Sequence, residues 1–186
     1  LREPLESGVV SLSRSKGTVH YPARFQLVMA ANPCPCGYGY GTGERCTCRE
    51  RERLRYFSRL SGPILDRIDI QIDVAPADRL PTGDSGHGTT SADMRATVTQ
   101  ARQAARERFR RQGWTCNAQA AGGWLHGNTP ASALAPVERA VYDQRLSLRG
   151  ADRALRLAWT LADLAGRSSP TMEDVMHGIA LRTRTP

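Results

Sequence analysis

The sequence predicts an incomplete α/β unit followed by an all-α domain. Residues 25–31 (FQLVMAA) are continuously apolar, as in a strand buried on both faces, and residues 68–74 (IDIQIDV) alternate with the period of two that a strand requires. Residues 76–90 are rich in Pro, Gly, Ser and Thr, which indicates a linker, and helical patterns dominate after them. We therefore expect a first domain over 1–75 and a helical domain over 91–186.

Three further elements are expected in the first domain. Residues 1–7 have the pattern of a helix end, closed by a glycine. Short β-type runs on either side of a polar tip predict a hairpin over 9–21, with Arg14 and Lys16 at the tip. Residues 49–60 form a helical stretch in which arginines alternate with glutamates, and these mixed signs favour a solvated helix.

Four helices are expected in the second domain. The first covers 91–112 and ends at a glycine, and the second and third cover 136–146 and 148–165. Thr171 is the expected N-cap of the last helix, whose first turn is acidic. The intervening residues 114–135 lack clear periodicity and predict an irregular region.

The charge balance favours a polyanionic partner. The 186 residues include 26 basic and 18 acidic side chains, a net charge of +8, and Lys16 is the single lysine. Phosphate, a nucleotide or nucleic acid would suit this arginine-rich composition, although an arginine-biased solvated surface is an equal alternative. No run of 18 apolar residues and no secretory leader is visible, so we expect a cytoplasmic protein without a membrane partner. Because the first residue is Leu1 rather than Met, we expect a piece of a longer protein.

Four of the five cysteines lie within fifteen positions, inside a glycine-rich insert at 33–48. Cys34, Cys36, Cys46 and Cys48 give the pattern C-x-C-x9-C-x-C. Two close pairs of thiolates suit a structural, four-coordinate Zn²⁺, although the usual pair spacing is C-x2-C. Free thiols are the alternative, and disulfides are disfavoured in a chain without a secretory signal.

No phosphate-binding loop is recognisable in this chain. The stretch at 37–43 (GYGYGTG) fits neither G-x-G-x-x-G nor G-x-x-x-x-G-K-[ST], so we expect a turn-forming insert there. The four histidines are scattered and form no nucleophilic constellation in the sequence.

Several segments resemble the magnesium-chelatase-like family of AAA+ ATPases, and within it the competence-associated members described as DNA branch-migration helicases. The resembling segments are LREPLESGVVSLSR (1–14), YPARFQLVMAANPCPCG (21–37) and LSGPILDRIDI (60–70), together with SLRGADRALRLAWTLADLAG (147–166), which is similar to the family's lid. The resemblance implies a partial P-loop NTPase core with a hairpin insert, followed by the lid. It also implies that the P-loop and the acidic strand end, which hold ATP and Mg²⁺, lie before Leu1.

The resemblance assigns roles to two residues of the first domain. Asn32 matches sensor 1, where a side-chain amide orients the attacking water, and the alternative is an Asn-Pro turn. Arg67 matches the arginine finger, which stabilises charge on the transferred phosphoryl group in a neighbouring subunit. Its alternative is a surface ion pair with Asp66 or Asp69.

In the lid, Arg149, Arg153 and Arg156 share one helix face, and the resemblance implies that one of them is the sensor-2 arginine that contacts the γ-phosphate. Similar lids place the sensor-2 arginine early in this helix, which favours Arg149 or Arg153 and leaves Arg156 as a helix-surface residue. The hairpin matches the pre-sensor-1 hairpin of ring helicases, so Arg14 and Lys16 would contact nucleic-acid phosphates, unless the tip is simply solvated.

Together these features predict the C-terminal part of an AAA+ motor that couples ATP hydrolysis to DNA remodelling or branch migration. The full-length protein would use ATP and Mg²⁺ and form a hexamer on single-stranded or branched DNA, whereas this chain alone would be inactive without a P-loop. Two alternatives remain at this point. One is a magnesium-chelatase motor subunit, and the other is a non-catalytic, zinc-stabilised nucleic-acid-binding module.

Overall fold

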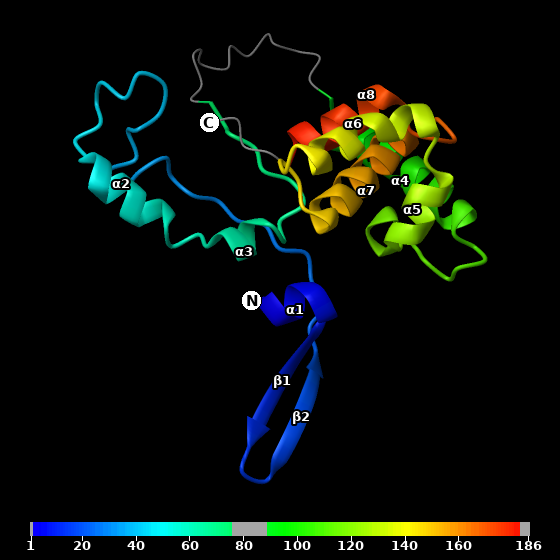
Figure 1. Cartoon of the computed structure of the whole chain (residues 1–186), viewed down its shortest axis with the longest axis horizontal. Helices are drawn as coiled ribbons and strands as arrows, with labels where there is room; N and C mark the ends of the chain where they lie inside the picture. The colour runs from blue at the N-terminus through cyan, green and yellow to red at the C-terminus, as the bar shows by residue number, and fades with distance from the viewer. Residues whose placement is uncertain (1, 76–88, 183–186) are drawn as a thin grey trace. The chain divides into compact units, whose positions relative to one another are not determined.

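The computed structural model describes residues 2–75 and 89–182 (Figure 1). The chain divides into two compact units, the first comprising Leu1–Ile68 and Val74–Pro76 and the second comprising Asp69–Asp73 and Ala77–Pro186. Most of the linker expected at 76–90 lies outside the described residues.

A β-hairpin follows the first helix of the chain. The elements are helix α1 (Arg2–Ser7) and the antiparallel strands β1 (Val9–Arg14) and β2 (Gly17–Pro22). Arg14 pairs with Gly17, so Ser15 and Lys16 form a two-residue turn, and Gly17 after it has a φ of +137°, which favours glycine. The predicted hairpin is confirmed, with the basic residues at its tip.

The strand predicted over 25–31 is wrong. This segment has no regular secondary structure, and most of its apolar side chains are exposed, Val28 by 83%. Extended backbone becomes a strand only when a neighbour satisfies its hydrogen bonds, and among the described residues only β1 and β2 pair in this way. The helices α2 (Glu50–Phe57) and α3 (Gly62–Leu65) complete the first unit.

The strand predicted over 68–74 is also wrong. Residues 68–75 have no regular secondary structure, and Ile72 and Val74 are exposed. The Gln71 N–H donates to the Leu181 carbonyl at 2.7 Å, and residues 69–73 belong to the helical unit instead of the first one. The α/β class is therefore seen only in part, because the described chain has one two-stranded sheet.

The second unit is helical throughout. Its elements are α4 (Ser91–Arg108), the 3₁₀ turn η1 (Asn117–Gln119), α5 (Gly122–Asn128), α6 (Ala131–Tyr142), α7 (Leu148–Leu164) and α8 (Met172–Ala180). Thr171 caps α8 through its hydroxyl, as predicted. Helix α6 starts before Pro136, although proline usually marks a helix start, and α5 forms in the region predicted to be irregular.

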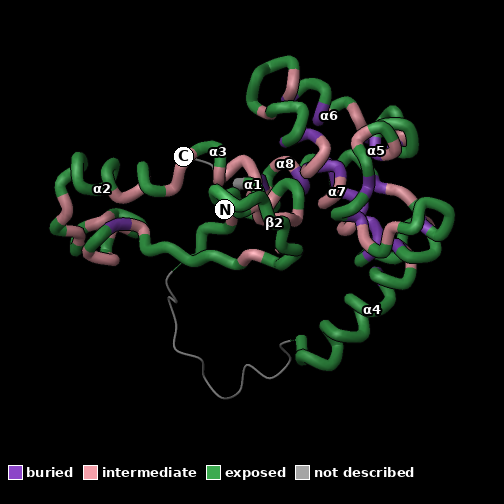
Figure 2. The backbone as a smooth tube through the Cα atoms, turned by 90° about the horizontal axis from the view of Figure 1, so that it is seen from below, coloured by how far each residue is buried: buried purple, intermediate pink, exposed green. Residues whose placement is uncertain are grey.

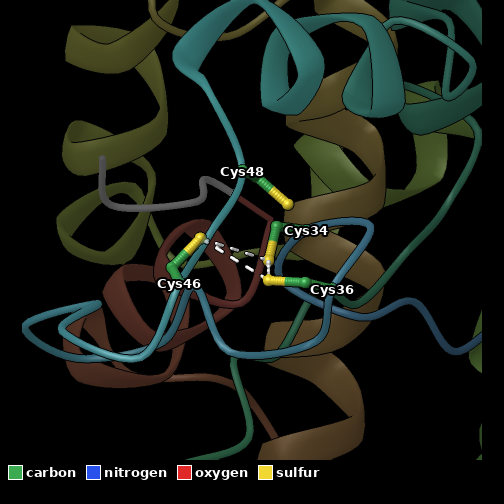
Figure 3. Close-up of side chains that lie close together, drawn as sticks. All are labelled: Cys34, Cys36, Cys46 and Cys48. Carbon is green, nitrogen blue, oxygen red and sulfur yellow. Dashed lines mark hydrogen bonds between the residues drawn. The ribbon is translucent and has the colours of Figure 1, made fainter.

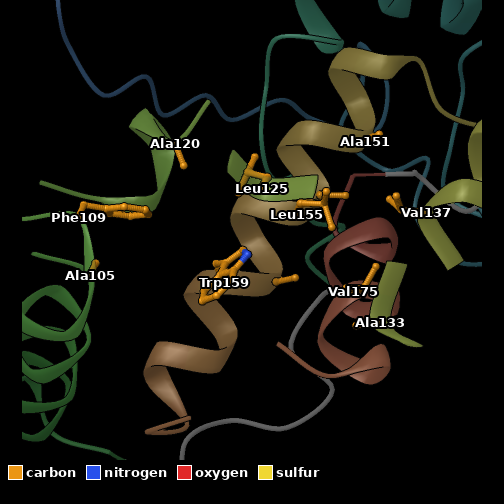
Figure 4. Close-up of a cluster of buried hydrophobic side chains, with 12 residues drawn as sticks. Ala105, Phe109, Ala120, Leu125, Ala133, Val137, Ala151, Leu155, Trp159 and Val175 are labelled. Carbon is orange, nitrogen blue, oxygen red and sulfur yellow. The ribbon is translucent and has the colours of Figure 1, made fainter. Parts of the chain in front are cut away.

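Helix α7 is the centre of the core of the second unit (Figure 4). Trp159 lies against Trp124, their ring centroids 5.0 Å apart, and its indole N–H donates to the Thr129 hydroxyl at 3.0 Å. Phe109 packs edge-on against Trp124 at 4.8 Å. The remaining core is built largely from alanine, which lets the helices approach closely. In Figure 2 the buried residues follow α7, whereas α2 and most of α4 are exposed.

Among the helices within residues 2–75 and 89–182, none is long and apolar enough to cross a membrane.

Candidate metal centre and arginine sites

Four cysteine thiols converge in the loop between β2 and α2 (Figure 3). The Sγ atom of Cys34 lies 3.2 Å from that of Cys36 and 3.7 Å from that of Cys46, and the last two are 3.7 Å apart. Cys48 completes the group, in which all sulfurs lie within 4.8 Å of one another. All four are free thiols, and Cys34 is fully buried.

Tight turns bring the two cysteine pairs together. The Gly37 N–H donates to the Cys34 carbonyl at 3.0 Å, and the Cys46 N–H donates to the Gly43 carbonyl at 2.8 Å. Gly37, Gly41 and Gly43 have φ values of +83°, +60° and +66°, a region that favours glycine. The prediction of a turn-forming insert is confirmed, and its turns have the effect of bringing the thiols together.

Gly39 has a separate role that the sequence pattern did not reveal. Its N–H donates to Cys34 Sγ at 3.2 Å, and a Cβ atom at this position would lie 3.0 Å from the same sulfur. Backbone amides that point at thiolates stabilise their negative charge, as the outer shell of a metal site does. Only glycine brings the amide this close without displacing the sulfur.

The cluster fits a tetrahedral metal ion of the zinc type. With Zn–S bonds of about 2.3 Å, a tetrahedron places its sulfurs about 3.8 Å apart. Both separations to Cys46 match this value, and the Cys34–Cys36 separation needs to open by roughly half an ångström. Four sulfur ligands leave no open coordination position, so such an ion would be structural.

The thiols of the cluster differ widely in acidity. Hydrogen bonds from the Tyr38 backbone and the Cys34 side chain lower the pKa of Cys36 to about 5. Burial raises the pKa of Cys48 to about 12. At neutral pH the cluster therefore carries a ready thiolate on Cys36, whereas binding of a metal ion would displace the proton of Cys48.

Arg67 is held by two contacts within the first unit. It follows α3, and its guanidinium pairs with the Glu6 carboxylate of α1 at 2.7 Å and donates to the Pro63 carbonyl at 2.5 Å. The side chain is only 10% exposed. The sequence had offered Asp66 or Asp69 as alternative partners, and no pattern in it pointed to Glu6.

Asn32 and the hairpin tip are exposed positions of the first unit. Asn32 follows the segment 25–31, so it does not end a strand here. Arg14 and Lys16 are exposed at the hairpin turn. The Ser13 and Thr18 hydroxyls, 2.9 Å apart, join the two strands just before this turn.

The three lid arginines occupy different environments on α7. Arg149 is exposed in the first turn, and Arg153 pairs with the Asp69 carboxylate at 2.5 Å. Arg156 donates through Nε and Nη2 to the Ala120 carbonyl, at 3.0 and 2.8 Å. Burial lowers the pKa of Arg156, as expected for a guanidinium partly removed from water. Arg156 thus joins α7 to the C-cap residue of η1, and no pattern within the helix indicates that Asp69 is the partner of Arg153.

Both halves of the chain match known families. Residues 1–80 match the family described as magnesium chelatase, subunit ChlI, and residues 88–182 match the family described as magnesium chelatase, subunit ChlI C-terminal. These matches, in this order, cover the hairpin, the cysteine loop and the helical unit. The chain belongs to the magnesium-chelatase-like family, in the branch that contains competence protein ComM.

Similar proteins occur in several bacteria. The chain is 42% identical over 186 residues to an uncharacterized protein of Mycobacterium tuberculosis, an alignment that covers 98% of this chain and 36% of that protein. It is 35% identical over 190 residues to the uncharacterized protein YifB of Escherichia coli, an alignment that covers 98% of this chain and 35% of YifB. It is 38% identical over 169 residues to competence protein ComM of Haemophilus influenzae, an alignment that covers 89% of this chain and 32% of ComM. The chain thus spans about a third of the length of these relatives.

Proposed function

We propose that this chain is part of an AAA+ ATPase that couples ATP hydrolysis to DNA remodelling, with branch migration as the specific activity. The observation that carries the proposal is the match of both halves of the chain to the magnesium-chelatase ChlI families. The guanidinium groups of Arg67 and Arg153 are nearly buried, each lies at a position matched to a phosphate-sensing arginine, and each binds a carboxylate. A guanidinium donates to carboxylate and phosphate oxygens alike, so each arginine would exchange its carboxylate for phosphate on contact with ATP.

In the full-length protein, ATP and Mg²⁺ would bind to residues outside this chain. The metal ion would neutralise charge on the phosphates. Arg67 would serve as the arginine finger toward the ATP of a neighbouring subunit in a hexamer, and Asn32 would orient the attacking water. Arg149 or Arg153 would contact the γ-phosphate as sensor 2.

DNA would contact the hairpin tip through Arg14 and Lys16. Two exposed cations, one at the end of β1 and one in the turn, suit phosphate contacts that do not depend on base sequence. The cysteine cluster would hold structural Zn²⁺ and fix the loop that contains it. This DNA-directed function is favoured over the motor subunit of a magnesium chelatase by the basic tip.

Replacing Arg67 by Ala in the full-length protein tests the ATPase proposal. Loss of an arginine finger lowers kcat by about 10³- to 10⁵-fold, and Arg67→Lys should recover little because lysine lacks the planar fork. Arg139→Ala, which removes an exposed arginine paired with Asp143 in the second unit, is the control. Steady-state ATP turnover is the measurement.

ATP turnover of Arg67→Ala within about twofold of the control would sink the proposal and favour the non-catalytic nucleic-acid-binding module. DNA binding measured on the same variants separates the remaining alternative. Salt-sensitive DNA binding that persists in Arg67→Ala supports the DNA motor, whereas a full-length protein that binds no DNA favours the chelatase subunit.

A further inference from the structure

The segment that carries the cysteine cluster also carries a basic surface that the proposed function does not use. We define residues 33–59 as the cysteine lobe; it contains six arginines and three glutamates, and all six arginines are exposed. The arginines of the lobe are Arg45, Arg49, Arg51, Arg53, Arg55 and Arg59. The sequence alone favoured a solvated helix here because of the mixed signs.

Helix α2 arranges these charges unfavourably for an isolated helix. Arg51 and Arg55 are four residues apart, which places like charges next to each other on the helix surface. Glu52 turns back to accept a hydrogen bond from the Arg49 backbone N–H at 2.8 Å, so its carboxylate is used at the helix start. A polyanion lying along the helix would relieve this repulsion.

Two tyrosines lie next to the cysteine cluster, and one of them contacts an arginine of the lobe. Tyr38 and Tyr40 are 50% and 39% exposed, and they flank Gly39, whose backbone is fixed against Cys34. The Arg45 guanidinium lies over the Tyr38 ring, 4.4 Å from its centroid. A planar cation and an aromatic ring stacked at the surface offer faces on which unpaired bases stack.

We propose that the cysteine lobe binds single-stranded DNA without sequence preference. The arginines of α2 would contact successive phosphates, and Tyr38 and Tyr40 would stack against bases. Exposed aromatic rings on a basic segment favour an unpaired strand over a duplex, whose bases are already stacked. The proposal rests on the DNA part of the proposed function and adds a second contact to the hairpin tip.

The test compares two matched pairs of arginines in the zinc-loaded chain. Arg51→Gln/Arg55→Gln on α2 and Arg102→Gln/Arg106→Gln on α4 each remove two exposed charges four residues apart on a helix. Binding of a fluorescent oligothymidylate of about 20 nucleotides is followed by anisotropy at several salt concentrations. The α2 pair should weaken binding about tenfold and lower the salt slope by about 1.4, whereas the α4 pair should stay within about twofold of wild type.

Tyrosine variants test the stacking contacts separately. Tyr38→Ala/Tyr40→Ala should weaken binding by ten- to a hundredfold, roughly, whereas Tyr38→Phe/Tyr40→Phe should bind within about twofold of wild type because the rings remain. Equal zinc content and equal circular dichroism verify that the loop is intact in each variant. The alternative partner is an acidic protein, and competition with polyglutamate tests it. Polyglutamate should not displace the DNA at equal charge concentration.

The proposal fails if the α2 pair loses no more affinity than the α4 pair, if the alanine variants bind like wild type, or if polyglutamate competes equally. If only Arg14→Gln/Lys16→Gln loses DNA binding, the proposed DNA contact of the cysteine lobe is contradicted. The proposed function is not contradicted by that result. If the wild-type chain binds no oligothymidylate, both proposed DNA contacts are contradicted. The ATPase test on Arg67 does not depend on that result.

Discussion

Single residues show where local patterns in the sequence suffice and where they do not. Thr171 was predicted as an N-cap from its spacing to the acidic first turn, and it donates to and accepts from Asp174 as a capping box requires. The second partner of Asp174, the Arg167 guanidinium at 2.5 Å, lies across a turn and has no local signal. The Glu6 partner of Arg67 and the Asp69 partner of Arg153 likewise have no local signal in the sequence.

The carboxylate of Asp174 makes the stability of the second unit sensitive to acid. Burial raises its pKa, but hydrogen bonds from the Thr171 backbone and the Arg167 guanidinium outweigh burial and hold the pKa below its ordinary value. A carboxyl with a lowered folded pKa stabilises the fold above its unfolded pKa of about 3.9, and this stability is lost as pH falls through the folded pKa.

We therefore expect Asp174→Asn to lower the free energy of unfolding by about 1–3 kcal/mol at neutral pH. The difference from wild type should shrink steadily below about pH 4, where the wild-type carboxyl takes up a proton. Urea unfolding at several pH values measures this difference in the free energy of unfolding. A difference that stays constant down to about pH 2 would show that charge is not the cause.

At the scale of elements, the helices were more predictable than the strands. The period of 3.6 in α7 depends on its own sequence, and its core residues Leu155 and Trp159 are buried as expected. The runs 25–31 and 68–74 have strand patterns, but a strand also needs a neighbour, which no pattern within the run can supply. The cysteine cluster was predictable from spacing, whereas its stabilising amide at Gly39 was not.

Helices α7 and α8 pack so closely that one glycine has no room for a side chain. A Cβ atom on Gly178 would lie 2.5 Å from the Ala154 carbonyl oxygen, which belongs to the backbone and cannot rotate away. We expect Gly178→Ala to destabilise the second unit by about 1–3 kcal/mol, although alanine favours helix formation by up to about 1 kcal/mol.

Gly127→Ala in α5 is the matched control, because a Cβ atom there meets nothing within 4 Å. This variant should be neutral or more stable by up to about 1 kcal/mol. Thermal unfolding followed by tryptophan fluorescence distinguishes the two. Equal effects of both substitutions would contradict close packing as the cause.

For the whole molecule, the division into two units predicts separate responses to metal. All cysteines of the cluster lie in the first unit, whereas Trp114, Trp124 and Trp159, the three tryptophans of the chain, lie in the second. Tryptophan fluorescence therefore reports on the helical unit, and hydrogen exchange over 33–48 reports on the cysteine loop.

Removing Zn²⁺ with a chelator should speed exchange over 33–48 by about tenfold or more and leave the tryptophan-detected midpoint within about 1 °C. The chain should hold one zinc ion by elemental analysis, Cys46→Ser should lose it, and Cys116→Ser should retain it. A chelator that shifts the tryptophan transition by several degrees, or a chain without bound metal, contradicts this prediction.

The exposed apolar segments 25–31 and 68–74 also affect how copies of this chain behave at high concentration. Val28, Ile72 and Val74 are 83%, 69% and 80% exposed, and contact between copies would remove this apolar surface from water. The net charge of +8 opposes such self-association by repulsion, and added salt screens that repulsion. Added salt therefore has two opposite effects on this chain: it weakens nonspecific binding of polyanions, and it promotes association of copies through their exposed apolar side chains.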